Sequence, residues 1–250
     1  MAVTIKSARE IELMKEAGRI LAITHDELEK ALKPGMSTMD IDRLGEQVIR
    51  SFGCIPSFKN YNGFPGSICV SVNDEVVHGI PDKRRIIQEG DIVSLDAGVI
   101  YQGYHSDAAR THAVGKITAE AEQLIEVTRQ SFFEGIKFAK AGNHLNDISS
   151  AIQQYAERFG YGVVRELVGH GIGENLHEDP EVPNFAQNRK GIKLAAGMTL
   201  AIEPMINAGR ADVVWLDDDW TVVTEDNSLS AHYENTVLIT DGDPVILSMH

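Results

Sequence analysis

An internal repeat constrains this chain more than any other feature of its sequence. Short matches recur at a constant offset of 107 residues, the step from Lys33 to Lys140. The matched pairs are Lys33-Pro34-Gly35 with Lys140-Ala141-Gly142, Asp40-Ile41 with Asp147-Ile148, Phe52-Gly53 with Phe159-Gly160, and residues 90–96 with residues 197–203. A constant offset across separate segments argues against chance and indicates a duplicated structural unit. We therefore expect two homologous halves, near residues 1–113 and 114–250, folded around an approximate two-fold axis.

Each half shows the same order of hydrophobic periodicities. Apolar residues at helical spacing predict helices over residues 7–32 and 38–52 in the first half and over 118–140 and 145–159 in the second. Ser7 followed by Glu10 fits a capping box, and Thr38 or Asp40 can cap the second helix. Strand-like runs follow the helices at residues 68–77, 91–96, 104–114, 162–168, 198–203, 220–223 and 233–240. Helices followed by mostly hairpin-linked strands predict an α+β fold.

Composition narrows the class of protein. The chain has 250 residues, with 23 Lys and Arg against 37 Asp and Glu, and a net charge of −14. This acidic balance argues against a protein that binds nucleic acid through phosphate contacts. Two cysteines, Cys54 and Cys69, cannot form a disulfide framework, and no stretch approaches the ~18 apolar residues of a membrane span. Residues 1–6 lead into a charged segment rather than an apolar signal core, and no Gly/Ser or Pro run separates the halves. We expect one cytoplasmic domain over residues 1–250, with no membrane partner.

Two aspartates fall on neighbouring predicted strands. Asp96 ends an apolar run, and Asp107 lies in the next strand, after a turn at Gln102-Gly103. A two-residue turn there pairs position 96 with position 109, which makes Asp107 the diagonal neighbour of Asp96. Because side chains alternate along strands, both carboxylates then point to one face, about 7–8 Å apart in backbone terms. One further residue in the loop would place them on opposite faces.

Acidic residues also interrupt strand-like runs in the second half. Glu203 ends such a run, at the position equivalent to Asp96 in the repeat, and Glu234 immediately precedes another. His170 lies in a Gly-His-Gly-Ile-Gly segment, where glycines let backbone and ligand approach closely. Taken alone, each acidic residue is typical of a turn or cap, and a lone histidine is typical of a structural residue. Together with Asp96 and Asp107 they predict two divalent first-row ions, because several buried anions need a neutralising cation.

Other site chemistries lack their motifs. The chain contains no Gly-Xaa-Gly-Xaa-Xaa-Gly sequence, no P-loop, no His-Glu-Xaa-Xaa-His pair and no Gly-Xaa-Ser-Xaa-Gly elbow. The acidic run Asp217-Asp218-Asp219 is typical of a solvated hairpin tip, and His232 belongs to no pattern. The absence of these motifs favours a dinuclear metal site over the other chemistries.

The motifs, taken in order, resemble the type I methionine aminopeptidases in their short bacterial form. The resemblance covers essentially the whole chain and rests on the segments 71–81, 104–111, 169–173, 201–204 and 228–234, together with Asp96, His177 and Glu178. It implies the duplicated pita-bread fold of that family, with a curved, mainly antiparallel sheet covered by two helix pairs. The duplicated fold agrees with the internal repeat, which is visible in the sequence independently of the resemblance.

The resemblance implies a set of metal ligands. Asp96 and Asp107 would hold one divalent ion and His170 and Glu203 the other, with Asp107 and Glu234 bridging the two. Glu203 would also act as the general base. The ions would be Co, Mn, Fe or Zn, since imidazole and carboxylate ligands accept all four. A monovalent cation is expected at Asn73 and Ser230.

The resemblance also implies residues that contact the substrate. His78 and His177 would lie on either side of the scissile bond, and the expected methionine pocket is lined by Tyr61, Phe64, Cys69 and Trp220. Leu176 stands where family members often carry an aromatic residue, and Asn62 stands where histidine is common. The change at Leu176 bears on the shape of the pocket.

The activity implied by the resemblance is hydrolytic removal of the initiator methionine from nascent polypeptides. The expected enzyme is a cytoplasmic monomer that meets its substrates at the ribosome and does not itself bind nucleic acid. Two alternatives stay open. One is a related metalloaminopeptidase of other specificity, such as a proline-selective enzyme, although those usually carry an extra N-terminal domain. The other is a metal-free pita-bread binding module, which predicts lost ligands, whereas all five are present here.

Overall fold

Two helix pairs repeat along the chain, one in each half. The computed structural model describes residues 3–249, so Met1, Ala2 and His250, at the ends of the predicted domain, lie outside the described residues. The helices are α1 (Ala8–Ala31), α2 (Thr38–Ser51), α3 (Ala119–Ile136) and α4 (Leu145–Glu157). Gly35 and Gly142, which are equivalent in the repeat, both adopt a positive φ, 90° and 96° respectively. The turn between the helices is therefore duplicated along with the helices themselves.

Local capping explains where the first two helices begin. Ser7 and Glu10 form the predicted capping box of α1. Helix α2 is capped by Ser37, which exchanges hydrogen bonds with Asp40, and not by Thr38 or Asp40. The prediction of the cap was wrong because three capping residue types lie within four positions. Only Ser37 has an acidic residue three positions later, as a capping box requires.

Short strands make up most of the remaining regular structure. The first half carries β1 (Ile55–Pro56), β2 (Ile68–Val72), β3 (Glu75–Val77), β4 (Ile92–Tyr101) and β5 (Tyr104–Ala113), with a 3₁₀ turn η1 (Tyr61–Gly63). The second half carries β6 (Gly162–Val163), β7 (Gly169–Gly171), β8 (Glu178–Val182), β9 (Thr199–Ile202), β10 (Met205–Asn207), β11 (Val213–Trp215), β12 (Val222–Thr224), β13 (Ser230–His232), β14 (Asn235–Leu238) and β15 (Val245–Ile246).

Several of these strands differ from the sequence prediction. The predicted strand 68–77 is split by a turn into β2 and β3, and the predicted strand 162–168 shrinks to β6. Strands β1, β7, β8, β10, β11, β13 and β15 were not expected. Each has five residues or fewer, which is too short for a two-residue alternation to show. Elements of this length are set by their neighbours rather than by local pattern.

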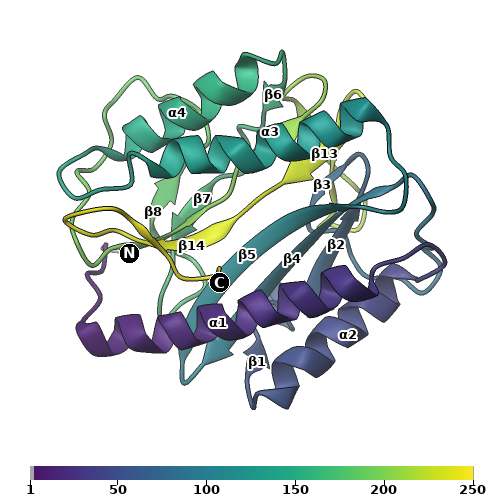
Figure 1. The fold of residues 1–250 in the computed structure, drawn as a ribbon, viewed down its shortest axis with the longest axis horizontal. Coiled ribbons are helices and arrows are strands. Elements are labelled where there is room, and N and C mark those ends of the chain that lie inside the picture. The colour runs from purple at the N-terminus through teal and green to yellow at the C-terminus, as the bar shows by residue number, and fades with distance from the viewer. Residues whose placement is uncertain (1–2, 250) are drawn as a thin grey trace.

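Antiparallel pairing joins strands from both halves. The hairpin β4–β5 is flanked by β1 and β2 on β4, and a second sheet runs in the order β15-β14-β9-β7-β8. Two smaller sheets have the orders β13-β10-β6 and β11-β12-β3, and the last of these joins β12 to β3 of the other half. Ala109 of β5 and Glu234 exchange two backbone hydrogen bonds of 3.0 and 3.4 Å. Figure 1 shows the consequence, with β5 and β14 side by side between the two helix pairs.

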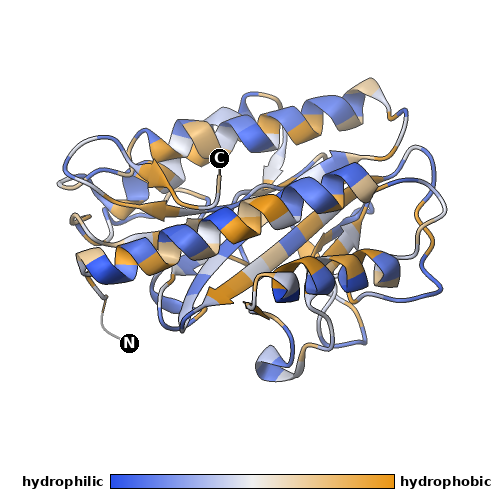
Figure 2. Ribbon diagram, turned by 60° about the horizontal axis from the view of Figure 1, so that its bottom comes forward, coloured by the Kyte–Doolittle hydropathy of each residue, from blue (hydrophilic) through white to orange (hydrophobic). Residues whose placement is uncertain are grey.

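The helices pack on the strands through apolar faces. In Figure 2 each helix carries both hydrophilic (blue) and hydrophobic (orange) residues along its length, as expected for amphipathic helices that cover a sheet. One core cluster joins Ile20, Leu21 and Leu28 of α1 to β2 and β4, and another lies under α3 and α4. Fully burying such a side chain contributes about 1.5–3 kcal/mol. Two further clusters mix residues of both halves, so the two halves pack against each other through apolar side chains.

The architecture confirms the expected α+β class. The helices cover the outside of the strands, and the segments that carry the predicted ligands lie on strands or strand ends between them. Within residues 3–249, no helix combines the length and the apolar character needed to cross a bilayer.

Candidate active site

The hairpin β4–β5 brings two carboxylates together. Asp96 pairs with Ala109, and Gly98 pairs with Asp107, so the two aspartates are diagonal neighbours on one face. This is the predicted register. Thr236 of β14 fixes the second strand, because the Asp107 backbone N–H donates to its hydroxyl at 2.8 Å and that hydroxyl donates to the Asp107 carbonyl oxygen at 2.9 Å.

The second half supplies the other predicted ligands from three neighbouring strands. Glu203 directly follows β9, and His170 lies on β7, where it pairs with Ala201 of β9. Glu234 directly precedes β14, which pairs with the other edge of β9. A Cβ atom at Gly169 would collide with the Ala201 carbonyl oxygen, so this glycine is required for β7 to approach β9.

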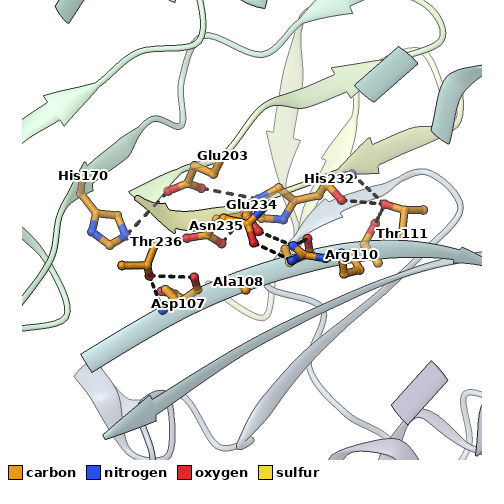
Figure 3. A network of polar contacts seen from close by, with 12 residues as sticks. Asp107, Ala108, Arg110, Thr111, His170, Glu203, His232, Glu234, Asn235 and Thr236 are labelled. Carbon is orange, nitrogen blue, oxygen red and sulfur yellow. Dashed lines mark hydrogen bonds and ion pairs between the residues drawn. The ribbon is translucent and has the colours of Figure 1, made fainter. Parts of the chain in front are cut away.

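A half-buried arginine, Arg110, holds the backbone at Glu234. The Arg110 guanidinium donates to the carbonyl oxygens of Ala109 and Glu234, and it donates to Oδ1 of Asn235 at 2.6 Å. It also stacks 4.4 Å from the centre of the Tyr233 ring. These contacts tie the end of β5 to the segment that carries Glu234, as Figure 3 shows. No role for Arg110 could be predicted from the sequence, because its partners Glu234 and Asn235 are 124 and 125 residues away along the chain.

The five predicted ligands converge on one buried point. Asp107, His170 and Glu234 are buried, and their ligand atoms lie within 4.8 Å of one another. Nε2 of His170 lies 3.7 Å from Oε1 of Glu203. Among the described residues, Oδ1 of Asp96, Oδ1 of Asp107 and Oε1 of Glu234 have no hydrogen-bond partner.

This clustering strongly disfavours negative charge. Removal from water raises the pKa of Glu203 to about 8 and that of Asp96 to about 7. Burial, reinforced by neighbouring carboxylates, raises the pKa values of Asp107 and Glu234 well above their usual range. Carboxylates that lack hydrogen-bond partners and repel one another are what a divalent cation neutralises, so these residues fit a metal site.

The state of His170 also fits a metal ligand. Its Nδ1 lies 2.8 Å from the carbonyl oxygen of Gly171. A carbonyl oxygen only accepts, so Nδ1 carries the hydrogen and donates it, and Nε2 keeps the lone pair that a metal needs. Burial lowers the pKa of His170 to about 3, which keeps the ring neutral.

His232 is a site residue that was not predicted from the sequence. Its Nε2 lies 3.7 Å from Oε2 of Glu203 and 3.9 Å from Oε2 of Glu234. Glu203, His232 and Glu234 form a second group whose ligand atoms lie within 4.8 Å of one another. A clue was available, because alternation along an extended chain places residues 232 and 234 on the same face.

A cavity of about 170 Å³ opens beside the carboxylates, and all five predicted ligands line it. The apolar part of its wall comes from Phe58, Phe64, Cys69, Leu176 and Trp220. Phe64 and Trp220 meet edge to face with their ring centres 5.1 Å apart. All four predicted pocket residues, Tyr61, Phe64, Cys69 and Trp220, therefore lie at the cavity, as does Asn62. Phe58 joins them without having been expected.

The two predicted substrate-contacting histidines also line this cavity. His78 adopts a positive φ of 60°, a costly conformation for a residue with a side chain, and its ring lies 6.2 Å from that of Trp220. The ring of His177 lies 4.2 Å from that of His170, and its Nδ1 lies 2.7 Å from the Tyr61 hydroxyl. Burial lowers the pKa of both histidines, that of His78 to about 4.

The predicted monovalent-cation residues lie together but away from this cavity wall. The Ser230 backbone N–H donates to the Asn73 carbonyl oxygen at 2.9 Å. The Asn73 side chain donates to Asp91 and accepts from the N–H of Ile92, and the Ser230 hydroxyl donates to Asn207. Because both side chains already have partners, a cation there would rely on backbone carbonyl oxygens.

Comparisons with known proteins agree with this geometry. The model of metallopeptidase family M24 matches residues 12–241. A methionine aminopeptidase of Clostridium acetobutylicum is 57% identical over 247 residues, which cover 99% of each chain. The crystal structure of a methionine aminopeptidase from Thermotoga maritima superposes with a TM-score of 0.97 at 44% identity, covering 100% of both chains.

A more distant relative shares the fold alone. The Xaa-Pro dipeptidase of Bacillus anthracis superposes with a TM-score of 0.80 at 24% identity, and this chain covers 62% of its length. The fold is thus the pita-bread fold that the resemblance implies, and the proline-selective alternative is not favoured. The chain belongs to metallopeptidase family M24 and, within it, to the methionine aminopeptidases.

Proposed function

We propose that this chain hydrolyses the peptide bond that follows an N-terminal methionine, using two divalent metal ions. The observation that carries the proposal is a cluster of four carboxylates, those of Asp96, Asp107, Glu203 and Glu234, which line one cavity. Among the described residues, three of these side chains have a buried carboxylate oxygen with no hydrogen-bond partner. Relatives that cover nearly the whole chain are named for this activity. A metal-free binding module gives no reason to retain such a costly group of carboxylates.

The ligands divide between two ions in this proposal. Asp96 and Asp107 would hold one ion, His170 and Glu203 would hold the other, and Asp107 and Glu234 would be shared between them. Imidazole and carboxylate ligands suit Co, Mn, Fe or Zn, and availability decides among these metals. Ions held there would supply Lewis-acid chemistry that makes a bound water molecule a better nucleophile at neutral pH.

Three side chains do the remaining chemistry. Glu203 accepts the proton of the attacking water on a carboxylate oxygen and passes it to the leaving amine nitrogen. His177 donates from Nε2 to the oxygen that becomes negative. His78, on the cavity wall, contacts the nitrogen side of the scissile bond. The position of both histidines next to the carboxylates supports these roles.

The cavity supports selection of methionine. Its wall offers aromatic rings, the Cys69 thiol and Leu176, and it has room for an unbranched side chain of moderate size. A flexible thioether packs well against such surfaces, whereas a charged side chain would lose its hydration without gaining a partner. Leu176 is 2% exposed and packs with Phe64 and Cys69, so it helps to set the width of the pocket.

The setting of the reaction follows from the same proposal. The substrates are the N-termini of nascent polypeptides, met at the ribosome in the cytoplasm by a monomer. The net charge of −14 makes direct binding to nucleic acid unfavourable. A monovalent cation at Asn73 and Ser230 would brace the segment between β2 and β3 against β13.

Steady-state kinetics on short peptides test the proposed specificity. The metal-free chain is reconstituted with Mn²⁺ or Co²⁺ and given Met-Ala-Ser, Leu-Ala-Ser and Pro-Ala-Ser in separate assays. We expect kcat/KM to be highest for the methionine peptide and activity to vanish with EDTA. Preferential cleavage of the leucine or proline peptide would overturn the specificity, and undiminished activity in EDTA would overturn the metal mechanism.

A further inference from the structure

The residue that directly follows His177 is held by the beginning of the chain. Glu178 is the first residue of β8, and residues 173–177, between β7 and β8, form a loop without helix or strand. We call residues 173–177 the His177 loop. Oε2 of Glu178 accepts hydrogen bonds from Nζ of Lys6 and from the Thr4 hydroxyl, each at 2.7 Å. The proposed donor is therefore one peptide bond away from a carboxylate with two distant partners.

The ion pair between Lys6 and Glu178 is buried. Each of the two side chains is 5% exposed. Lys6 is also fixed from its other contacts, because Nζ donates to the Thr4 hydroxyl and the backbone N–H donates to the Gly197 carbonyl oxygen at 2.8 Å. Figure 1 shows this segment leaving the start of α1 toward the strands of the second half. Since a buried charge that loses its partner is costly, each member of the pair requires the other.

Glu178 uses its two oxygens for two different parts of the molecule. Oε2 faces Lys6, whereas Oε1 accepts the backbone N–H of Asn175 in the His177 loop at 3.2 Å. The other end of the loop is held through Gly173, whose N–H donates to the Asn175 carbonyl oxygen at 3.1 Å and whose carbonyl oxygen accepts the His105 N–H at 2.8 Å. The carboxylate thus joins the loop to the segment that precedes α1.

The loop is shaped to let Lys6 approach. A Cβ atom at Gly173 would collide with Cε of Lys6 and would lie 2.8 Å from Oε1 of Glu178. Only a residue without a side chain leaves room there for the lysine stem. The close approach of Lys6 is therefore a property of the loop as well as of the lysine.

We propose that Lys6 is a positioning residue for the reaction, which acts through Glu178 to hold the His177 loop. The inference rests on the proposed function, in which Nε2 of His177 donates to the oxygen that becomes negative. Such a donor has to be in place before the charge forms. Tyr61 holds the ring through Nδ1, and the ion pair holds the backbone next to it, where residues 173–177 belong to no strand.

Two substitutions remove the ion pair in different ways. Lys6→Met keeps an apolar stem and removes the positive charge. Glu178→Gln keeps the shape of the side chain, but an amide has one oxygen and cannot accept from the loop and from Lys6 on opposite sides. Because Lys6→Met leaves the Glu178 charge buried without its cation, Glu178→Gln decides the question if Lys6→Met does not fold.

Steady-state kinetics of the Mn²⁺-reconstituted chain with Met-Ala-Ser measure the effect on the reaction. We expect each substitution to lower kcat by about 10–100-fold, because misplacing a catalytic group by about 1 Å can cost about 100-fold. KM and the number of bound ions should stay as in the parent chain. Parent values of kcat in the folded variants would overturn the proposal.

A background that lacks His177 distinguishes positioning from a general structural effect. Added to His177→Ala, either substitution should lower kcat by less than about twofold, because two changes that act through one residue are not additive. The control Ile148→Val removes a buried methyl group under α3 and α4, and it should lower Tm by roughly 1–6 °C with kcat unchanged. If the full loss in kcat recurs in the His177→Ala background, Lys6 does not act through His177 and the proposal is wrong.

Hydrogen exchange of the metal-free chain measures the loop without turnover. By mass spectrometry, the peptide that spans residues 173–178 should exchange at least about tenfold faster in Lys6→Met and Glu178→Gln, because a hydrogen bond to a charged group is lost. Ile148→Val should exchange there as the parent does. Unchanged exchange in the two folded variants of an active chain would overturn this inference alone. A parent chain that releases no methionine would instead overturn the proposed function, whatever the exchange shows.

Discussion

The Tyr61 hydroxyl lies 2.7 Å from Nδ1 of His177, although 116 residues separate the two along the chain. Burial raises the pKa of Tyr61, so the phenol keeps its proton. When the phenol donates to Nδ1, the hydrogen of the neutral His177 ring lies on Nε2, the nitrogen that the proposed mechanism uses as a donor. Tyr61 thus connects the expected methionine pocket to the chemistry of bond cleavage.

Replacing Tyr61 with Phe should lower kcat by about tenfold and change KM little. The ring that lines the pocket is kept, and only the hydrogen bond to His177 is lost, which is worth roughly 1–1.5 kcal/mol. Steady-state kinetics with Met-Ala-Ser measure both constants, and Tyr101→Phe is the matched control because the Tyr101 hydroxyl contacts Gln102, outside the site. A rise in KM at constant kcat would mean that Tyr61 serves only the pocket.

Replacing His177 with Ala should lower kcat by about 10²–10³ and leave the number of bound ions unchanged. His177 is assigned to the developing negative charge, and loss of one such donor typically costs that much. The bound metal is counted by atomic absorption after gel filtration. If the metal content falls together with kcat, His177 is a ligand and its proposed role is wrong.

Replacing Asp107 with Asn should abolish activity and leave a folded chain that retains fewer than two ions. The substitution removes a bridging charge from a group of four carboxylates while keeping the size of the side chain and the backbone bonds to Thr236. Circular dichroism checks that the variant is folded, and metal analysis counts the ions that it retains. Asp243→Asn, whose parent side chain is 90% exposed, serves as the control and should behave like the unmodified chain. Full activity in Asp107→Asn with two bound ions would contradict the dinuclear assignment.

The carboxylates should make the metal-free chain less stable as pH rises from 6.5 to 8. The folded chain holds protons on Asp96 and Glu203 up to pKa values of about 7 and 8, whereas the unfolded chain releases them near 3.8 and 4.5. The folded state therefore binds more protons in this range, and raising the pH favours unfolding. Burial shifts the pKa values of His170 and His78 the other way, to about 3 and 4, and their opposing effect fades as the pH rises above their usual pKa of 6.5.

Calorimetry in EDTA at several pH values measures this dependence. We expect Tm to fall between pH 6.5 and 8, and Mn²⁺ to remove most of the fall. At pH 8 metal-free Glu203→Gln should melt higher than the parent, by roughly 2–12 °C, because relieving a poorly solvated charge is worth on the order of 1–3 kcal/mol and each kcal/mol shifts Tm by about 2–4 °C. A metal-free Tm that rises over this range would show that the carboxylate charges are already compensated without a metal.

Local sequence was sufficient to predict those structural features that depend only on residues close together in the chain. The turn at Gln102-Gly103 determines the register of β4 and β5, so the placement of Asp96 and Asp107 on one face could be predicted. The capping box at Ser7 and the glycine turns at Gly35 and Gly142 are local in the same sense. The repeat extended these predictions from one half to the other.

Features that depend on distant contacts could not be predicted in this way. His232 enters the site because β13 pairs with β10 and bonds to Thr111, which is 121 residues away. The Tyr61–His177 contact and the hydrogen bond from Arg110 to the Glu234 carbonyl oxygen likewise join segments far apart in sequence. Short strands such as β7 are too brief to carry a periodic pattern, although His170 lies on one of them.

Intact-mass spectrometry of a protein substrate tests the central claim most directly. A small folded protein with a flexible Met-Ala N-terminus is incubated with the Mn²⁺-reconstituted chain, and matched substrates that begin Leu-Ala and Pro-Ala are treated in parallel. We predict that the first substrate loses one methionine residue and no more, and that the other two keep their masses. An unchanged Met-Ala substrate, together with loss of the first residue from the leucine or proline substrate, would contradict the proposed function.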